Sequence, residues 1–314
     1  MTEIPLVLGV DGGGTKSLGL ISTIEGTVVA RREVGASNAS VVGNEGAAKN
    51  LYELIAACCL DAQCTPRDLH ALVFGLAGAG DDANRRRLID AVNALAKNHG
   101  WAPLPITIYT DARIALEGAF DGGPGVVIIA GTGSSIMGKT PDNDVRLVGG
   151  WGRVLGDEGS GYYIGLQAIK AVTRDFDGRD HSGILRQTFV ERFGWSTRER
   201  VLAAVYRENF SIPSIAPVVL NGAAGGDQVC RGILEEAAAL LARQVEATAR
   251  LFPPDERIGV VMVGGLIDHE TVYAQVLDRQ IRSIMPQADI RRALHTPAHG
   301  AVFLARELLR KGIS

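Results

Sequence analysis

The chain has few cysteines, and they form no metal-binding pattern. Only four of its 314 residues are cysteine, and no CxxC, CxxH or HExxH arrangement occurs among these and the six histidines. Zinc sites use such spacings, so zinc binding is disfavoured, and disulfides are disfavoured too. Cys58, Cys59 and Cys64 lie on or just after an apolar helical stretch, and Cys230 stands alone. We expect reduced, buried thiols.

The chain also lacks an excess of one charge and any long apolar run. It carries 32 Lys+Arg against 35 Asp+Glu, a net charge of −3, and its longest basic run is Arg85 to Arg87. Binding to nucleic acid or anionic lipid needs a concentrated basic surface, so we expect neither nucleic acid nor membrane as a partner. The apolar runs 126–130 and 260–263 are far shorter than a membrane span, and the acidic start with Glu3 is unlike a signal peptide. We expect a cytoplasmic protein.

What the chain does contain points to a globular protein with glycine-built loops. With 46% hydrophobic and 21% charged residues it can bury a sizeable core, and its length favours two domains. Its 39 glycines cluster where apolar strands end, which is typical of loops built around a ligand.

The order of expected elements repeats along the chain. Each half opens with a strand, a glycine turn and a returning strand, which predicts a duplicated architecture of the α/β class. Amphipathic spacing predicts helices through Leu51, Leu88 and Ile233. We expect strands at 5–10, 17–23, 71–76, 106–109, 126–130, 136–139, 145–148 and 258–263.

Three glycine turns follow apolar strands and predict phosphate binding. They are GVDGGGTKS at 9–17, AGTGSS at 130–135 and VGG at 263–265. Glycine lets backbone N–H groups approach phosphate oxygens closely, and Thr15, Thr132 and Ser134 add hydroxyl groups. Any one of them could be a simple tight turn, but three in one chain favour phosphate binding.

Two better-known nucleotide-binding motifs match the sequence, but the residues around or within each match argue against nucleotide binding. GSSIMGKT at 133–140 fits the P-loop expression, but the turn sequence from Pro141 prevents the helix that a P-loop requires. The sequence 78–83 fits GxGxxA, but Asp81 and Asp82 would place negative charge where a pyrophosphate must bind, and they suit a helix cap instead. No GxSxG elbow of a serine hydrolase is present.

Five segments together resemble a known family. GVDGGGTKS, TDA at 110–112, AGTGSS, GGWGRVLGDEGSGYYIG at 149–165 and MVGG at 262–265 are similar to the N-acetylglucosamine kinase branch of the BadF/BadG/BcrA/BcrD ATPase family. That family belongs to the sugar kinase, Hsp70 and actin superfamily. The resemblance implies two ribonuclease H-like domains of an actin-like ATPase fold, with ATP and sugar in an interdomain cleft. We expect the first domain at 1–112 plus 297–314 and the second, with a helical insertion, at 113–296.

The same resemblance implies the site residues. Asp11 would stand near Mg²⁺ and act on the ion through its water shell. ATP would contact Gly13, Gly14, Thr15, Lys16, Gly131, Thr132, Gly133, Gly264 and Gly265. The sugar would contact Asn38, Asp111, Ser134, Ser135, Gly150, Trp151, Gly152 and Asp157. No adenine contact can be matched within 211–226.

Three of these residues have an ordinary structural alternative. Asp111 follows a strand end, the usual place for a functional residue in an α/β sheet, but that position equally suits the N-cap of the next helix. Trp151 could belong to the core, although its glycine neighbours favour a loop. Asp157 could belong to a solvated acidic turn with Glu158, although carboxylates are good acceptors for sugar hydroxyls.

The leading functional hypothesis is a sugar kinase. It would use ATP and Mg²⁺ to phosphorylate the 6-hydroxyl of N-acetylglucosamine or glucosamine, with Asp111 as general base, and we expect a homodimer. N-acetylmuramic acid stays open as a substrate, because single contacts discriminate weakly between such sugars. The alternatives are an ATPase activator of a 2-hydroxyacyl-CoA dehydratase, which needs cysteines for an iron–sulfur cluster, and a nucleotide-binding scaffold like actin.

Overall fold

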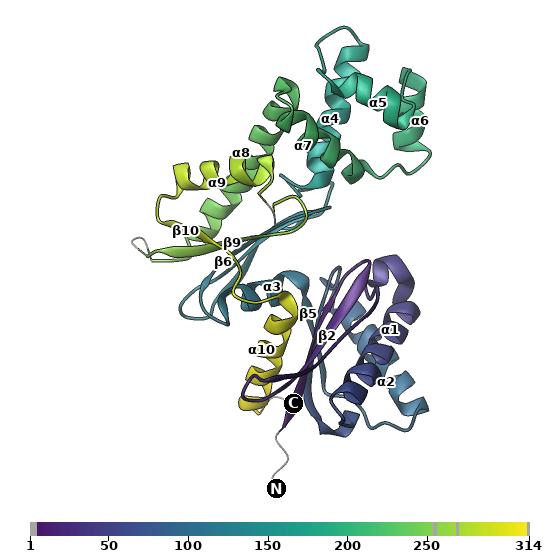
Figure 1. Cartoon of the computed structure of the whole chain (residues 1–314), viewed down its shortest axis with the longest axis vertical. Coiled ribbons are helices and arrows are strands. Elements are labelled where there is room, and N and C mark those ends of the chain that lie inside the picture. Colours follow the sequence, from purple (N-terminus) through teal and green to yellow (C-terminus); the bar gives the residue numbers. More distant parts are fainter. Residues whose placement is uncertain (1–4, 254–255, 268–269, 313–314) are drawn as a thin grey trace. The chain divides into compact units, whose positions relative to one another are not determined.

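The computed structural model describes residues 5–253, 256–267 and 270–312, so Glu3 lies outside the described residues. The chain forms two compact units, Met1–Gly123 with Arg292–Ser314 and Pro124–Arg291 (Figure 1). The first unit continues to Gly123, past the helix Asp111–Phe120, whereas the boundary expected from the sequence, between 112 and 113, falls within that helix. Among the described residues, no helix is long and apolar enough to span a membrane.

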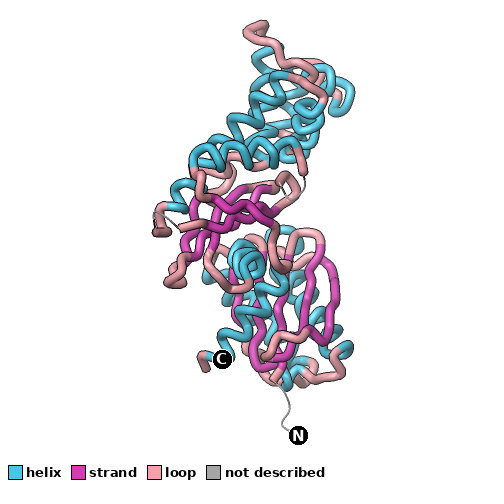
Figure 2. Tube along the Cα trace, turned by 60° about the vertical axis from the view of Figure 1, so that its left-hand side comes forward, coloured by secondary structure: helices cyan, strands magenta, loops and turns pink. Residues whose placement is uncertain are grey.

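The first unit is a five-stranded mixed sheet with helices on both faces (Figures 1 and 2). Strand order is β3-β2-β1-β4-β5, with β1 antiparallel to β2 and parallel to β4. The strands are β1 (Leu6–Gly12), β2 (Lys16–Thr23), β3 (Val28–Gly35), β4 (Leu69–Leu76) and β5 (Ile106–Thr110). The helices are α1 (Ala39–Asp61), α2 (Asp82–Asn98), α3 (Asp111–Phe120) and α10 (Pro297–Arg310), with a short 3-10 turn at Pro66–Asp68.

Alternation along the central strands builds a separate core on each face of this sheet. Leu8 and Leu72 pack with α1 and α2, whereas their neighbours Val7 and Val73 pack with α3 and α10. This follows from the two-residue period of a strand. The expected return of the C-terminal helix onto the first domain is confirmed, because α10 packs against Gly9 of β1 so closely that a Cβ there would overlap its backbone.

The second unit repeats this sheet and adds an insertion of helices. Its strand order is β10-β9-β6-β7-β8. The strands are β6 (Gly125–Ala130), β7 (Ser134–Lys139), β8 (Val145–Gly149), β9 (Ile258–Val263) and β10 (Ala288–Arg291). The helices are α4 (Gly161–Phe176), α5 (Leu185–Phe193), α6 (Arg198–Tyr206), α7 (Ala216–Ala224), α8 (Gln228–Ala249) and α9 (Val272–Ile284), with a 3-10 turn at Ile212–Ile215.

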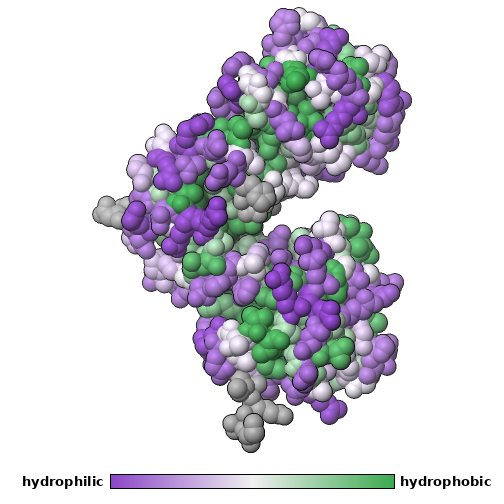
Figure 3. All heavy atoms as spheres, viewed as in Figure 1, coloured by the Kyte–Doolittle hydropathy of each residue, from purple (hydrophilic) through white to green (hydrophobic). Residues whose placement is uncertain are grey.

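The predicted duplication is confirmed at the level of topology. In both sheets the central strand pairs antiparallel with the strand that follows it and parallel with a strand later in the chain. The outer parallel pairs, β4 with β5 and β9 with β10, also correspond. Strands β3 and β10 were not among those expected from the sequence. On the face shown in Figure 3, polar and apolar residues are interspersed over each unit.

Candidate functional site

Asp11 lies inside strand β1, not in the turn after it as the sequence suggested. It pairs with Leu18 of β2 and Gly75 of β4. Its neighbour Val10 packs toward α1 and α2, so the Asp11 side chain is on the opposite face, which carries α3 and α10. Burial, followed by the charge of Asp111, raises its pKa to about 6, while Lys16 acts in the opposite direction.

Asp111 is the first residue of α3, directly after strand β5. The N-cap is Thr110, whose hydroxyl accepts from the Arg113 N–H at 3.2 Å, so the alternative assignment of Asp111 as N-cap is wrong. Asp111 Oδ1 accepts from the Ala112 N–H at 2.9 Å. Burial raises the pKa of Asp111, and hydrogen bonds from the backbone oppose that rise. A partly desolvated carboxylate of this kind is a stronger base than one in water.

The strand register places these two carboxylates at the same end of one sheet. Asp11, Gly75 and Tyr109 are in line across β1, β4 and β5, and Asp111 follows two residues after Tyr109. Gly75 carries no side chain between them, and that space is taken by Ile114 of α3. Two neighbouring carboxylates repel each other, which is why the charge of one raises the pKa of the other. Such a pair is suited to a cation or to proton transfer.

The first glycine turn, residues 12–15, presents free backbone donors next to Asp11. The Gly13 N–H donates to Lys16 O at 2.9 Å, and Gly13 O accepts from the N–H groups of Ser37 and Asn38, both at 3.1 Å. Within the described part of the chain, the N–H groups of Gly14 and Thr15 have no partner. The turn can therefore donate two hydrogen bonds to an anion.

Lys16 and Asn38 both have structural partners in the first unit. The Lys16 ammonium pairs with Glu33 at 2.8 Å on the exposed part of β2 and β3. Asn38 caps α1, since its Oδ1 accepts from the Ser40 N–H at 2.9 Å. The cap uses only the amide oxygen, so the Asn38 side-chain NH₂ stays available as a donor.

The second glycine turn, residues 130–135, repeats the geometry of the first. Gly131 N–H donates to Gly133 O at 2.9 Å, and Gly131 O accepts from Gly161 N–H at 2.8 Å at the start of α4. Among the described residues, the N–H groups of Thr132 and Gly133 have no partner. In both units the carbonyl of a turn glycine accepts a hydrogen bond from residues at the start of a following helix. Two N–H groups of each turn stay free to bind an anion.

Asp157 and Ser134 of this turn belong to one hydrogen-bonded group. Ser134 Oγ donates to Glu158 O at 2.7 Å, and Ser134 N–H approaches Asp157 Oδ1 at 3.5 Å. Burial raises the pKa of Asp157, and Glu158 accepts at Oε2 from Gln244 Nε2 at 2.9 Å. These carboxylates are therefore held by the protein, unlike those of a simple solvated turn. Ser135 lies one residue further along β7.

The glycines that flank Trp151 adopt backbone conformations that other residues rarely take. Gly150 and Gly152 have φ of +70° and +80°, and Gly150 lies against Ser135. Trp151 itself is 74% exposed, so it does not belong to the core of its unit. An exposed indole on a glycine-built loop beside Ser135 can stack on a ligand.

The third glycine turn lies beside the second. Leu266 N–H donates to Ala130 O at 3.3 Å, and Ile267 N–H donates to Gly264 O at 2.9 Å. Gly264 has φ of +115°, and a Cβ there would overlap the backbone of Ala130, whereas Gly265 faces open space. Close approach of two chains thus requires glycine at 264, and Gly265 leaves room for a ligand.

Both rejected nucleotide motifs have other structures. Residues 133–140 cover strand β7 and the turn after it, and β8 follows in place of a helix. Asp81 is the N-cap of α2, because its Oδ1 accepts from the Ala83 N–H at 3.0 Å. The helix-cap interpretation of Asp81 is therefore confirmed.

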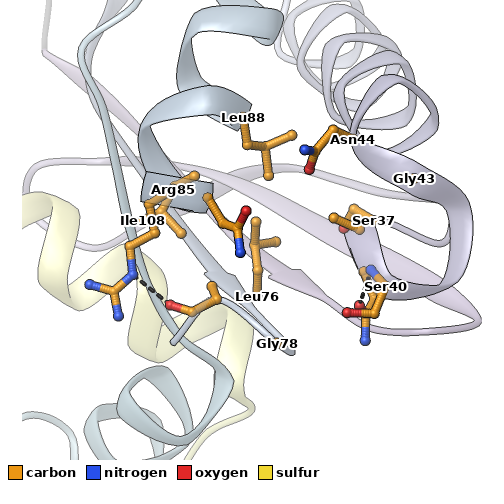
Figure 4. Close-up of a pocket in the computed structure, with 13 residues that line it drawn as sticks. Ser37, Ser40, Gly43, Asn44, Leu76, Gly78, Arg85, Leu88 and Ile108 are labelled. Carbon is orange, nitrogen blue, oxygen red and sulfur yellow. Dashed lines mark hydrogen bonds between the residues drawn. The ribbon is translucent and has the colours of Figure 1, made fainter. Parts of the chain in front are cut away.

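The first unit contains a cavity that was not predicted from the sequence. This cavity has a volume of about 350 Å³ and lies at the start of α1 and α2 (Figure 4). Asn38 is on its wall, together with Ser40, Asn44 and Arg85. Asn38, Ser40 and Asn44 come from the start of α1 and Arg85 comes from α2, so no single local motif could have indicated the cavity.

Two α/β units with this strand order, each with a donor-rich turn after its central strand, define the actin-like ATPase class of fold to which sugar kinases belong. A model of the BadF/BadG/BcrA/BcrD ATPase family matches residues 8–305. The chain belongs to this family.

Three kinases or kinase structures are similar to this chain over nearly their whole length. The N-acetylmuramic acid/N-acetylglucosamine kinase of Clostridium acetobutylicum is 30% identical, covering 96% of this chain and 98% of that protein. The N-acetyl-D-glucosamine kinase of Dictyostelium discoideum is 26% identical, covering 96% and 97%. A solved structure from Chromobacterium violaceum, described as an N-acetylglucosamine kinase, is 25% identical with a TM-score of 0.70, covering 97% and 99%.

Proposed function

We propose that this protein is an ATP-dependent kinase that phosphorylates the 6-hydroxyl of an amino sugar, N-acetylglucosamine or glucosamine. The observation that carries the proposal is the pair Asp11 and Asp111, two partly buried carboxylates at one end of a sheet, beside a turn with free N–H groups. Phosphoryl transfer needs mainly positioning, charge stabilisation and a proton acceptor. The family and the kinase relatives support the same activity.

Asp111 is the proposed general base. It accepts the proton of the sugar 6-hydroxyl while that oxygen bonds to the γ-phosphorus of ATP, and the bond from this phosphorus to the β–γ bridging oxygen breaks to release ADP. The raised pKa of Asp111 suits this task, because a base is most effective when its pKa is nearer the working pH. For binding of the sugar we propose Asn38, Asp111, Ser134, Ser135, Gly150, Trp151, Gly152 and Asp157.

The glycine turns are the proposed phosphate-binding elements. Free N–H groups at Gly14, Thr15, Thr132 and Gly133 are suitable donors to phosphate oxygens. We also propose ATP contacts at Gly13, Lys16, Gly131, Gly264 and Gly265.

The residues of the first unit also fit a magnesium ion. Mg²⁺ prefers a few carboxylate oxygens with water, and Asp11 offers one beside the second carboxylate of Asp111. The ion would supply neutralisation of charge on the transferred phosphoryl group. Asp11 would hold its water shell, and the raised pKa of Asp11 would fall when a cation is bound, because opposite charge favours the ionised form.

The dehydratase activator is the less supported alternative. Cys58, Cys59 and Cys230 are buried, and burial raises the pKa of Cys58 and Cys230 to about 12, which disfavours the thiolate that ligates iron. A non-catalytic scaffold would need neither Asp111 nor Asp157. The homodimer stays a prediction, and light scattering of the purified protein would test it.

A coupled assay for ADP release with a panel of sugars tests the proposed function. We expect ADP release that depends on an amino sugar and on Mg²⁺, and a product phosphorylated at the 6-hydroxyl by NMR. Release of ADP at the same rate without any sugar would contradict the kinase activity, and full activity in excess chelator would contradict the role of Mg²⁺.

A further inference from the structure

Gln244 of α8 contacts both ends of the 149–158 segment, which joins β8 to α4. At one end its Nε2 donates to Glu158 Oε2 at 2.9 Å. At the other end its Oε1 lies so close to Gly149 that a Cβ on this glycine would overlap it. Four of the proposed sugar contacts are in this segment, namely Gly150, Trp151, Gly152 and Asp157. One side chain thus contacts both ends of the segment that carries them.

The packing of α8 against the sheet fixes the position of Gln244. Thr248, one turn later on the same helix, is fully buried, and its Oγ1 donates to the Gln244 carbonyl at 2.9 Å. A Cβ at Gly138 of β7 would overlap the Thr248 methyl group, so α8 lies directly against the sheet there. Residues four apart share one face of a helix, so Gln244 faces the sheet as well. A rigid helix, and not the segment itself, therefore determines where the amide lies.

Stability alone does not explain a glutamine at this position. Among the described residues, the buried Gln244 Oε1 has no hydrogen-bond partner. Exchanging the amide oxygen and nitrogen would place two acceptors against each other at Glu158, so the orientation of the amide is determined by that contact. A buried acceptor without a donor destabilises the folded state, and an apolar side chain of the same length would avoid this cost. Such groups occur mainly where function requires them.

The end of the segment is held in a backbone conformation that is unfavourable without support. Asp157 has φ of +58°, in the left-handed region that residues other than glycine rarely adopt. The Glu158 carbonyl accepts from Ser134 Oγ at 2.7 Å, and the next carbonyl accepts from the Tyr273 hydroxyl at 2.7 Å. Gln244 holds the Glu158 side chain. Strained residues persist only where their surroundings enforce them, so these contacts orient the Asp157 carboxylate.

The start of the segment has more backbone freedom. Gly149 and Gly150 have φ of +73° and +70°, and glycine can leave such conformations more easily than other residues. The exposed Trp151 follows directly. Contact with Gln244 at Gly149 limits the conformations of this end, and with them the positions of the indole.

We propose that Gln244 is a positioning residue, which holds the 149–158 segment in the conformation that binds the sugar. It acts through Glu158 and Gly149 and contacts no substrate itself. Without it, the sugar would have to order the segment on binding, and that ordering would weaken sugar affinity but not the phosphate contacts of ATP. This inference rests on the proposed kinase function.

The test on the full-length protein begins with Gln244→Met, which keeps the length of the side chain and removes both polar atoms. We expect the KM for N-acetylglucosamine to rise about tenfold and the KM for ATP to stay within about threefold, because one hydrogen bond to a charged group is lost. The melting temperature should change little, since removal of the unsatisfied oxygen offsets the lost bond. The matched control is Arg243→Met on the exposed face of α8, which should change none of these quantities.

A reciprocal pair of substitutions tests the bond between Gln244 and Glu158. Gln244→Glu removes the donor and places two carboxylates together, so it should raise the KM for the sugar at least as much as Gln244→Met. Adding Glu158→Gln restores one hydrogen bond with donor and acceptor exchanged. The double variant should therefore recover most of the lost sugar affinity, and no recovery would overturn the role of this bond.

Fluorescence of Trp151 gives a readout that needs no kinase activity. The Trp151 signal is the difference between each protein and its Trp151→Phe version, measured without substrate. We expect lower anisotropy of this signal in Gln244→Met than in the wild type, because the indole samples more orientations once the segment is released.

The outcomes separate this inference from the proposed function. Unchanged sugar KM and unchanged Trp151 anisotropy in Gln244→Met would overturn the inference and leave the kinase proposal intact. An equal rise of both KM values with a lower melting temperature would also overturn it, because Gln244 would then only stabilise the fold. A wild type that phosphorylates no sugar would refute the kinase proposal, and the anisotropy would still decide whether Gln244 holds the segment.

Discussion

Replacing Asp111 by asparagine separates proton transfer from structure. Asparagine has nearly the same shape, and its Oδ1 can still accept from the Ala112 N–H, which Asp111 Oδ1 accepts at 2.9 Å. What asparagine cannot do is take a proton from the sugar hydroxyl. Because Thr110 is the N-cap of α3, the helix also keeps its cap in this variant.

The expected magnitudes for catalysis and stability therefore differ. General base catalysis contributes about 10² to 10⁴ in rate, so kcat should fall by that factor, equivalent to roughly 3 to 5 kcal/mol of barrier. The free energy of unfolding should stay the same or rise near neutral pH, since the variant no longer buries this charge. The pKa of Asp11 should fall below about 6, because the Asp111 charge contributes to raising it.

Steady-state kinetics, ATP binding by calorimetry and thermal melts on one preparation measure all three quantities. Thr110→Ala is the matched control, because it removes the true cap and should cost about 1 kcal/mol of stability. We expect Thr110→Ala to melt earlier with nearly normal specific activity, and Asp111→Asn to melt normally with little activity. An Asp111→Asn protein with a lower melting temperature and normal turnover would refute the catalytic assignment.

Three further predictions follow from the same geometry. Asp11→Asn should raise the free energy of unfolding by up to about 3 kcal/mol at pH 8 and by little at pH 4. The reason is that the pKa of Asp11 in the folded protein, about 6, exceeds the ordinary 3.8, so the wild type loses stability as pH rises through about 6. Urea titrations that show the same gain at both pH values would contradict this prediction. Gly264→Ala should destabilise by more than about 2 kcal/mol, because it combines a positive φ with backbone overlap at Ala130, whereas Gly265→Ala should change the melting temperature little. Gly133→Val should weaken ATP far more than sugar in calorimetry, since its side chain would meet Asp157 and obstruct the free N–H groups of the turn; unchanged nucleotide affinity would refute phosphate binding there.

The sequence predicted the sheets well because their signals are local. Apolar runs that end in glycine or in other turn residues marked eight strands, and the repeated strand, turn and strand predicted the duplication. Two strands escaped: β10 (Ala288–Arg291) has only four residues, two of them charged, and β3 (Val28–Gly35) carries three consecutive charged residues. The end of β1 was placed too early because Asp11 looks like a turn residue, whereas pairing with Leu18 and Gly75 keeps it in the strand.

The chemistry of the site depended more on three-dimensional structure. Glycine turns can be recognised in the sequence, but their carbonyls accept from the N–H groups of Gly161 and Ser37, which are distant in sequence. Burial raises the pKa of Asp11, and the charge of Asp111, one hundred positions later, adds to this rise because β1, β4 and β5 pair in parallel. The cavity at Asn44 and Arg85 likewise depends on packing of α1 beside α2.

The duplication itself separates two parts of the proposed chemistry. The last paired residues are Gly12 with Ser17 in the first sheet and Ala130 with Ser134 in the second, so Ile129 occupies the position that corresponds to Asp11. Both turns keep their free N–H groups, but of the two central strands only β1 carries a carboxylate, because β6 (GVVIIA) is wholly apolar. An aliphatic Ile129 can neither hold a cation nor accept a proton. We therefore infer that anion binding by the backbone belongs to both copies, whereas cation binding and proton transfer belong to the first.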